Sequence, residues 1–326
     1  QMIQRAHDLG VETAFDRAVT MKPCNIGTQG ICCKNCGMGP CRLPLPKSGI
    51  EGEDTRKGIC GATPNTIAAR NFIRMIAGGA AAHSDHGRSV AEVFMAAARK
   101  ETDAYKIKDT RKLLEVAQVL GVETTVEVDG EQLDRDMDEI AVEVAEKALN
   151  EWGKAEGELL FAKRAPEPRY ELWKKQGVVP RNIDREIVEI MHRTHIGVDQ
   201  DYKNLMKQGT RAAIADGWGG SMLATELQDI LFGTPYPVAS EANLGVMKED
   251  LVNIVIHGHE PVLSEMIVAV AQKKELHDYA VSKGANGIQL SGICCTANEI
   301  LQRHGVPLCG TFLQQELAII TGACVA

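Results

Sequence analysis

The residues of this sequence with the clearest chemical potential are six cysteines near its beginning. They are Cys24, Cys32, Cys33, Cys36, Cys41 and Cys60. Their centre has the pattern C-C-x-x-C-x4-C and is rich in glycine, which lets the backbone approach a ligand closely. Several thiolates converging on one point are the usual ligands of an iron–sulfur cluster. Since one cluster needs four thiolates, two of the six require a separate explanation.

Four of these cysteines have a spacing that suits a single site. Cys33, Cys36 and Cys41 lie in one loop, and Cys60 follows at a distance, just before a predicted helix that begins at Thr63. This arrangement favours a [4Fe–4S] cluster. A structural zinc site is the alternative, although zinc sites usually pair two C-x2-4-C motifs, and the second motif is missing here.

Cys24 and Cys32 are the two surplus thiols. Two thiolates do not complete a cluster, but the same pair from a second copy of the chain, across a two-fold axis, would supply four. The alternative is that one or both are ordinary buried thiols. Their spacing alone leaves both interpretations open.

A second group of metal-ligating types lies in the last third of the chain. His257-Gly258-His259 and Ser291-Gly292-Ile293-Cys294-Cys295 each follow a predicted parallel strand. Carboxyl ends of parallel strands meet at one edge of a sheet, where ligands are commonly held. His259 and Cys295 are therefore candidate metal ligands that need further ligands from elsewhere, whereas His257 is expected to be an ordinary histidine beside the sheet.

A third group follows the glycine pair Gly78-Gly79. His83 and His86 are three residues apart with Asp85 between them. Histidine titrates near neutral pH, so this spacing suits proton transfer. The alternative is a set of polar residues at a helix end. Cys309 and Cys324 are expected to be buried thiols without a chemical role.

The elements that position these residues are predicted to be helical in the first two thirds of the chain. Apolar residues at spacings of three and four predict helices over 5–21, 64–78, 88–107, 110–120, 133–151, 182–192 and 199–230. After a linker at 234–237, strands at 252–256, 287–293 and 306–309 alternate with helices at 261–283, 299–304 and 312–321.

This order predicts an α/β protein. Residues 1–232 form an all-helical cluster-binding domain that carries the six clustered cysteines. Residues 233–326 form the first part of a Rossmann-like, doubly wound parallel α/β domain. The net charge of −8 argues against a general nucleic-acid binder. No stretch of about 18 apolar residues predicts a transmembrane helix, and no secretory signal is evident. The clustered cysteines favour a reducing, cytoplasmic setting over a disulfide framework.

Together these residues resemble the nickel–iron–sulfur carbon monoxide dehydrogenases of anaerobes. The resemblance is greatest to the dehydrogenase subunit of acetogen carbon monoxide dehydrogenase/acetyl-CoA synthase complexes. It runs through the whole chain and is carried by CNIGTQGICCKNCGMGPCR, GAAAHSDHGR, ADGWGGSMLATELQDILFGTP, EANLGV, NIVIHGHEP, SGICCTANE and QQELAIITGA.

The resemblance implies three kinds of metal cluster. Cys24 and Cys32 match the pair that shares a D-cluster, [4Fe–4S] or [2Fe–2S], with a second subunit. His259 and Cys295 match two ligands of the nickel-containing C-cluster (Ni–4Fe–4S). The ligands of the [4Fe–4S] B-cluster, an electron relay, are matched by Cys33, Cys36, Cys41 and Cys60.

The resemblance also implies a path for protons. His83 matches a histidine near the C-cluster implicated in acid–base chemistry, and His86 matches the next member of the path. Asp216 is similar to a carboxylate near the same cluster. The family's chains are substantially longer than this one, and the remaining C-cluster ligands would follow Ala326. This chain therefore resembles the N-terminal half of such a subunit and is not expected to complete the C-cluster alone.

The implied reaction is the reversible oxidation of CO with water to CO2, two protons and two electrons. Electrons would leave through the B- and D-clusters to a ferredoxin-like carrier. The implied partners are a second copy of the chain and an acetyl-CoA synthase subunit. Two alternatives are a hybrid-cluster protein (hydroxylamine reductase) and, for this chain alone, a non-catalytic iron–sulfur electron-transfer fragment.

Overall fold

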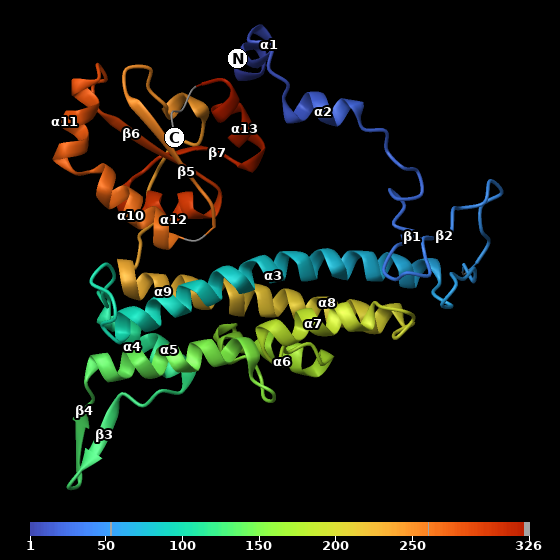
Figure 1. Cartoon of the computed structure of the whole chain (residues 1–326). Coiled ribbons are helices and arrows are strands. Elements are labelled where there is room, and N and C mark those ends of the chain that lie inside the picture. Colours follow the sequence, from blue (N-terminus) through green and yellow to red (C-terminus); the bar gives the residue numbers. More distant parts are fainter. Residues whose placement is uncertain (53, 260, 323–326) are drawn as a thin grey trace. The chain divides into compact units, whose positions relative to one another are not determined.

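Residues 1–52, 54–259 and 261–322 are described by the computed structural model (Figure 1). The chain divides into a helical unit, Pro23–Leu227, and an α/β unit that combines Gln1–Lys22 with Gln228–Ala326. This arrangement confirms the predicted fold class, a helical part followed by a parallel α/β part. The domain division at 232/233 stays a prediction, and it differs from these units by assigning the first residues to the helical part.

One long helix, α3 (Pro64–Ala98, 35 residues), organises the helical unit. Thr63 caps its first turn by accepting a hydrogen bond from the Thr66 amide, and proline occupies the first helical position. The predicted break at Gly78-Gly79 is wrong, because the helix runs through both exposed glycines. Ala77 and Ala80 on either side are buried, so packing offsets the roughly 1 kcal/mol that each glycine costs a helix.

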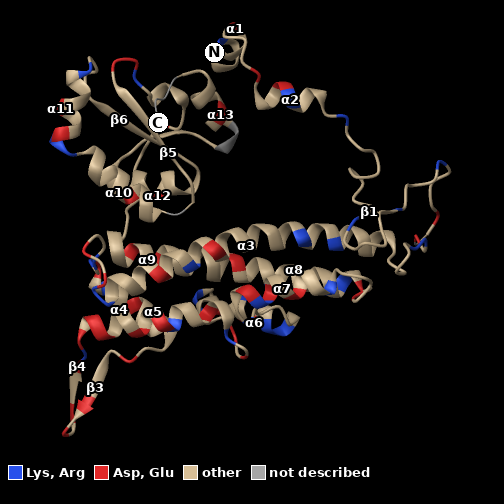
Figure 2. Ribbon diagram, in the orientation of Figure 1, with Lys and Arg blue, Asp and Glu red and all other residues tan. Residues whose placement is uncertain are grey.

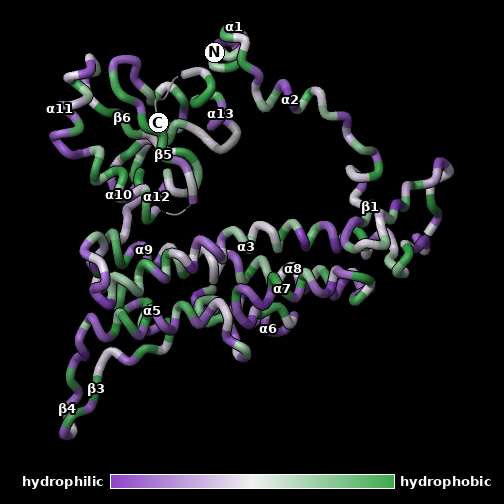
Figure 3. The backbone as a smooth tube through the Cα atoms, viewed as in Figure 1, coloured by the Kyte–Doolittle hydropathy of each residue, from purple (hydrophilic) through white to green (hydrophobic). Residues whose placement is uncertain are grey.

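Shorter helices surround α3, which packs against α5, α7 and α8. Ile73 of α3, Ile190 of α7 and Leu205 of α8 meet in a buried apolar cluster. Figure 3 shows hydrophobic and hydrophilic positions alternating along these helices, and Figure 2 shows acidic and basic residues interspersed on them. The bounds are α4 (Thr110–Leu120), α5 (Met137–Gly153), α6 (Glu167–Gln176), α7 (Ile183–Arg193) and α8 (Tyr202–Ile214).

The helix α8 does not end at Ile214 but continues through a π-helical segment, Ala215–Ser221, into α9 (Met222–Phe232). This segment approaches α3 closely. A Cβ added to Gly87 of α3 would lie 2.6 Å from the Gly220 carbonyl oxygen. The wider π turn, a feature frequent at functional sites, therefore carries Asp216 against the middle of α3.

Two short antiparallel pairs interrupt the helical unit, and neither was predicted. One pair joins β1 (Cys32–Cys33) to β2 (Cys41–Arg42) within the cysteine loop. The other joins β3 (Thr125–Val128) to β4 (Glu131–Asp134) through Asp129-Gly130. Both residues of this turn have positive φ, 53° and 85°, as a type I′ hairpin turn requires.

The α/β unit contains a parallel sheet with the order β5-β6-β7. Ile256, Val268, Ile300 and Val306 form an apolar cluster that packs helices on this sheet. The predicted helix over 261–283 is two helices, and α12 begins at Cys294 rather than at 299. The bounds are β5 (Val252–His257), α10 (Pro261–Ala271), α11 (Lys274–Ser282), β6 (Ile288–Ile293), α12 (Cys294–His304), β7 (Leu308–Gly310) and α13 (Phe312–Ile320).

Two short helices, α1 (Met2–Asp8) and α2 (Ala14–Thr20), belong to the same unit. Arg5 donates a hydrogen bond to the Thr321 carbonyl oxygen, which ties α1 to the end of α13. They replace the single helix predicted over 5–21, because Gly10 adopts a positive φ of 67° between them. In the described residues, no helix combines the length and apolar character needed to cross a membrane.

Candidate metal-cluster sites

Four cysteines border one cavity in the helical unit. The β1–β2 pair places Cys33 directly opposite Cys41, while Cys60 lies just before the cap of α3. Together with Cys36, these side chains line one small cavity. The structure therefore brings together the four cysteines whose spacing predicts one site.

Two glycines allow these cysteines to converge. A Cβ on Gly39 would lie 3.0 Å from the Cys33 carbonyl oxygen, and a Cβ on Gly58 would lie 3.4 Å from the Cys41 Sγ atom. Any larger residue at either position would press on the cysteines or fill the space between them. Within the described chain, no three His, Cys, Asp or Glu residues form a group that would hold a single metal ion. Four soft thiolates around a shared cavity are a donor set that fits a [4Fe–4S] cluster.

The electrostatics of the cavity favour the thiolate form of Cys60. Burial raises the pKa of this thiol, but hydrogen bonds from the Arg70 guanidinium and the Ala62 amide outweigh burial and lower the pKa below its ordinary value. Arg70 Nη1 lies 3.5 Å from the Cys60 Sγ atom. The thiolate is the form that ligates metal.

Cys24 and Cys32 lie outside this cavity. Cys24 is exposed and Cys32 is half-buried, so Cys24 is not an ordinary buried thiol in the single chain. Backbone amides of Gly27 and Ile26 donate toward the Cys24 sulfur and lower its pKa. Asn71 of α3 donates to the Cys32 carbonyl oxygen at 3.0 Å and anchors the loop. An exposed thiol with a lowered pKa is able to ligate a cluster that a second molecule also ligates.

The second group of candidate ligands gathers at the carboxyl edge of the parallel sheet. His257 and Ile293, the last residues of β5 and β6, are paired in register. The Thr296 amide donates to the Gly258 carbonyl oxygen at 3.1 Å, which joins the segments that follow the two strands. The predicted pair, His259 and Cys295, is exposed on these segments, and its role as a ligand pair stays a prediction.

The structure also joins two neighbours of that pair. His257 Nε2 lies 3.2 Å from the Cys294 Sγ atom. Cys294 has a φ of 67°, a left-handed conformation that is unusual for cysteine and that turns β6 directly into α12. His257 was expected to be an ordinary histidine and Cys294 had no assigned role. Both residues stand at the carboxyl ends of neighbouring predicted strands. This position in the sequence is the signal that could have predicted their contact.

His83 and Asp216 meet through a side-chain hydrogen bond. The distance from His83 Nδ1 to Asp216 Oδ1 is 2.7 Å, and both side chains are partly exposed. Close packing brings them together, because a Cβ on Gly220 would lie only 3.2 Å from the His83 backbone carbonyl carbon. His86 is half-buried about one turn further along α3.

Three residues that were not predicted hold the backbone beside His83. Ser84 Oγ donates to the Asp184 carboxylate at 2.5 Å, and Trp152 Nε1 donates to the Ser84 carbonyl oxygen at 2.9 Å. Ser84 and Trp152 are buried. These contacts fix α3 against α5 and α7 at the level of His83, so they position the histidine rather than add chemistry.

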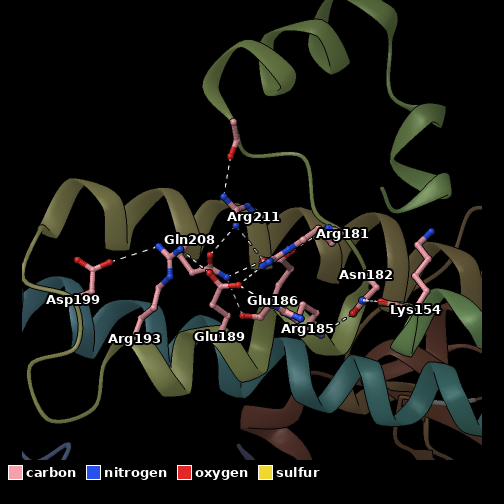
Figure 4. Close-up of polar contacts among 11 residues, drawn as sticks. Lys154, Arg181, Asn182, Arg185, Glu186, Glu189, Arg193, Asp199, Gln208 and Arg211 are labelled. Carbon is pink, nitrogen blue, oxygen red and sulfur yellow. Dashed lines mark hydrogen bonds and ion pairs between the residues drawn. The ribbon is translucent and has the colours of Figure 1, made fainter. Parts of the chain in front are cut away.

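Another dense polar cluster joins α7 to α8 (Figure 4). Glu186 is fully buried and accepts three hydrogen bonds from Arg181, one from its backbone amide and two from its guanidinium, each 3.0 Å long. Gln208 donates to the same carboxylate at 2.8 Å, and Arg211 donates to the Gln208 amide oxygen at 3.0 Å. The buried carboxylate of Glu186 therefore has both a positive partner and hydrogen-bond donors. This arrangement is typical of a network that stabilises the fold.

Comparison with known proteins places these sites in context. Residues 31–326 match the Prismane/CO dehydrogenase family. The chain is 54% identical over 327 residues to carbon monoxide dehydrogenase 1 of Methanosarcina acetivorans, covering 100% of this chain and 50% of that protein. It is 45% identical over 327 residues to the carbon monoxide dehydrogenase/acetyl-CoA synthase subunit beta of Moorella thermoacetica, covering 99% of this chain and 46% of that protein.

Solved structures agree with this similarity. The nickel-free carbon monoxide dehydrogenase of Thermococcus sp. AM4 superposes with a TM-score of 0.89 at 50% identity, covering 99% of this chain and 49% of that chain. Carbon monoxide dehydrogenase IV of Carboxydothermus hydrogenoformans gives a TM-score of 0.86 at 46% identity. The chain spans about half the length of the curated relatives it matches. These similarities do not favour the hybrid-cluster alternative.

Proposed function

Because this chain belongs to the Prismane/CO dehydrogenase family, we propose that it is part of an anaerobic carbon monoxide dehydrogenase. The reaction is the reversible oxidation of CO with water to CO2, two protons and two electrons. The cavity bordered by four cysteines carries this proposal, since an enzyme that releases electrons needs a relay to carry them away. The names of the relatives cited above support the choice of substrate.

The relay is assigned to Cys33, Cys36, Cys41 and Cys60 as ligands of the B-cluster. A [4Fe–4S] cluster bound there supplies one-electron transfer. The chain's own contribution is to hold the four thiolates around one cavity and to keep Cys60 deprotonated, which the lowered pKa of that thiol supports.

The exposed pair, Cys24 and Cys32, is assigned to a D-cluster shared by two copies of the chain. The exposure of Cys24 supports this assignment, because a shared ligand has to be reachable by the second subunit. The functional protein is then a homodimer, and the D-cluster is the last relay before a ferredoxin-like electron carrier.

His259 and Cys295 are assigned as two ligands of the C-cluster, with the remaining ligands supplied by residues beyond this sequence. The nickel–iron–sulfur group bound there supplies the binding of CO and the activation of water. The parallel sheet supports the assignment, since it delivers both residues to the same carboxyl edge.

His83 is assigned to proton transfer. When Nδ1 donates to Asp216, the other ring nitrogen, Nε2, is the atom that takes up and releases a proton. Asp216 orients the ring. His86, one turn further along α3, is the next acceptor.

Two partners follow from the proposed reaction. An acetyl-CoA synthase subunit would consume CO made in the reverse direction, as the name of the Moorella thermoacetica relative suggests. A ferredoxin-like protein would exchange electrons with the D-cluster. The cysteines that the structure describes form no disulfide with one another, which fits a reducing, cytoplasmic setting.

The test is the metal content and spectroscopy of the chain purified without oxygen. We expect iron and sulfide in the ratio of [4Fe–4S] clusters and a reduced-cluster electron paramagnetic resonance (EPR) signal. Cys36→Ser should remove the B-cluster signal, whereas Cys309→Ser, a fully buried thiol of the α/β unit, should retain it. An unchanged signal in Cys36→Ser would refute the assignment. Nickel in the full-length protein, with CO-dependent viologen reduction that this chain alone lacks, would establish the reaction.

A further inference from the structure

Arg70 is the most unusual charged residue of the helical unit. It lies two turns into α3, is 1% exposed, and has the greatest volume among the fully buried side chains that the structure describes. Buried arginine is rare in proteins unless an opposite charge compensates it. The same side chain lines the cavity of the four cysteines.

The contacts of Arg70 do not include such a charge among the described carboxylates. Nη1 lies 3.5 Å from the Cys60 Sγ atom, and Nη2 donates to the Asp199 carbonyl oxygen at 2.7 Å. Nε is buried without a hydrogen-bond partner. Its neighbour Gln200 is an uncharged amide that donates to the Cys60 carbonyl oxygen at 2.8 Å. The thiolates of the cavity are therefore the negative charge that Arg70 faces.

We propose that Arg70 is a positioning residue whose buried charge raises the reduction potential of the [4Fe–4S] cluster held by Cys33, Cys36, Cys41 and Cys60. This inference rests on the proposed function of the cavity. Reduction transfers one electron to the cluster and increases the negative charge of the cluster and its thiolates by one. A nearby buried cation stabilises this more negative state, and the net charge and hydrogen bonds around a cluster set its potential.

The shape of the side chain adds a second effect. One arm of the guanidinium points to Cys60 and the other holds the Asp199 carbonyl, so Arg70 fixes the cysteine to the loop between α7 and α8. Thr66 reinforces this connection by donating to the Gln200 carbonyl oxygen at 2.8 Å. The positive charge is thereby held at one place and does not relax away from the cluster.

The experiment is a redox titration with dithionite, followed by EPR, of the chain purified without oxygen. Arg70→Gln removes the charge and Arg70→Lys retains it. Arg74→Gln is the matched control, because Arg74 is on the same helix but donates to the Thr194 hydroxyl at 2.8 Å. Titrating all variants in a Cys24→Ser, Cys32→Ser background leaves the relay cluster as the expected source of the signal.

At the potential that half-reduces the wild-type cluster, we expect Arg70→Gln to lower the ratio of reduced to oxidised cluster at least tenfold. This corresponds to a fall of about 59 mV for a one-electron couple. Arg70→Lys and Arg74→Gln should change that ratio by less than about threefold, since both keep the buried charge. An unchanged ratio in Arg70→Gln would overturn the inference.

Loss of the cluster in the variants is also decisive. If Arg70→Gln loses its iron while Arg70→Lys keeps it, the charge is needed to hold the cluster, which supports the inference. If both variants lose iron, the guanidinium acts through its shape and the inference fails. A wild-type chain without a [4Fe–4S] signal would instead contradict the proposed function of the cavity, so the two failures are distinguishable.

Discussion

The contact between α3 and the π-helical segment should make Gly87 intolerant of a single methyl group. A Cβ there would lie 2.6 Å from the Gly220 carbonyl oxygen and 2.9 Å from a ring carbon of Trp152. An ordinary contact between carbon and a carbonyl oxygen is about 3.3–3.6 Å long, so the backbone of the π segment has to move by most of an ångström. Overpacking of this kind costs about 1–3 kcal/mol. The higher helix propensity of alanine offsets up to about 1 kcal/mol of this destabilisation.

The matched control lies on the same helix. A Cβ on Gly79 meets no atom within 4 Å, and the residue is exposed. Gly79→Ala should therefore stabilise the helical unit by about 0.5–1 kcal/mol, whereas Gly87→Ala should destabilise it by about 1–2 kcal/mol. Urea unfolding followed by circular dichroism measures both variants. A Gly87→Ala midpoint equal to or above that of Gly79→Ala would refute the packing argument.

The remaining predictions concern charge and metal. Glu186→Ala leaves the Arg181 backbone amide and the buried Gln208 amide without an acceptor, while the Arg181 guanidinium keeps its ion pair with Glu189. The free energy of unfolding should therefore fall by about 1–3 kcal/mol, and an unchanged value would contradict this reasoning. Burial raises the pKa of Glu189, but its ion pair with Arg181 outweighs burial and holds the pKa below 4.5. The stability from this pair is therefore complete above pH 4.5 and is lost as the pH falls through the lowered pKa, so Glu189→Gln should flatten the acid limb of unfolding curves measured across pH. Cys24→Ser with Cys32→Ser should remove the iron of one cluster per dimer and leave the relay cluster in each subunit, and iron analysis that showed no loss would rule out the bridging role.

The sequence predicted those elements whose pattern is local. The helix over 110–120 and the strand over 252–256 match α4 and β5, because each is an uninterrupted run of one periodicity. The glycine pair in α3 was misinterpreted, since a helix packed on several neighbours tolerates exposed glycine. The hairpin at Asp129-Gly130 was missed although its turn residues are a strong local signal.

The candidate sites were predicted to different degrees for physical reasons. Spacing grouped the four cavity cysteines because three of them share one loop. The partnership of His83 with Asp216 rests on a π turn, and apolar periodicity does not distinguish this turn from an ordinary helix. Arg70 looks like any surface charge in a sequence, and only the packing around Cys60 shows that it is buried.

The continuity of α3 has a consequence for how the two chemistries are coupled. Arg70 contacts Cys60 near the start of this helix, and His83 contacts Asp216 thirteen residues later, a separation of about 20 Å along the axis. A helix broken at Gly78-Gly79 would let the two contacts shift independently. In the unbroken helix, Thr63 and its cap fix one end, and the close approach of Gly87 to the π segment fixes the helix next to His83. The residue groups proposed to carry electrons and protons therefore share one continuous helix, which sets the distance between them.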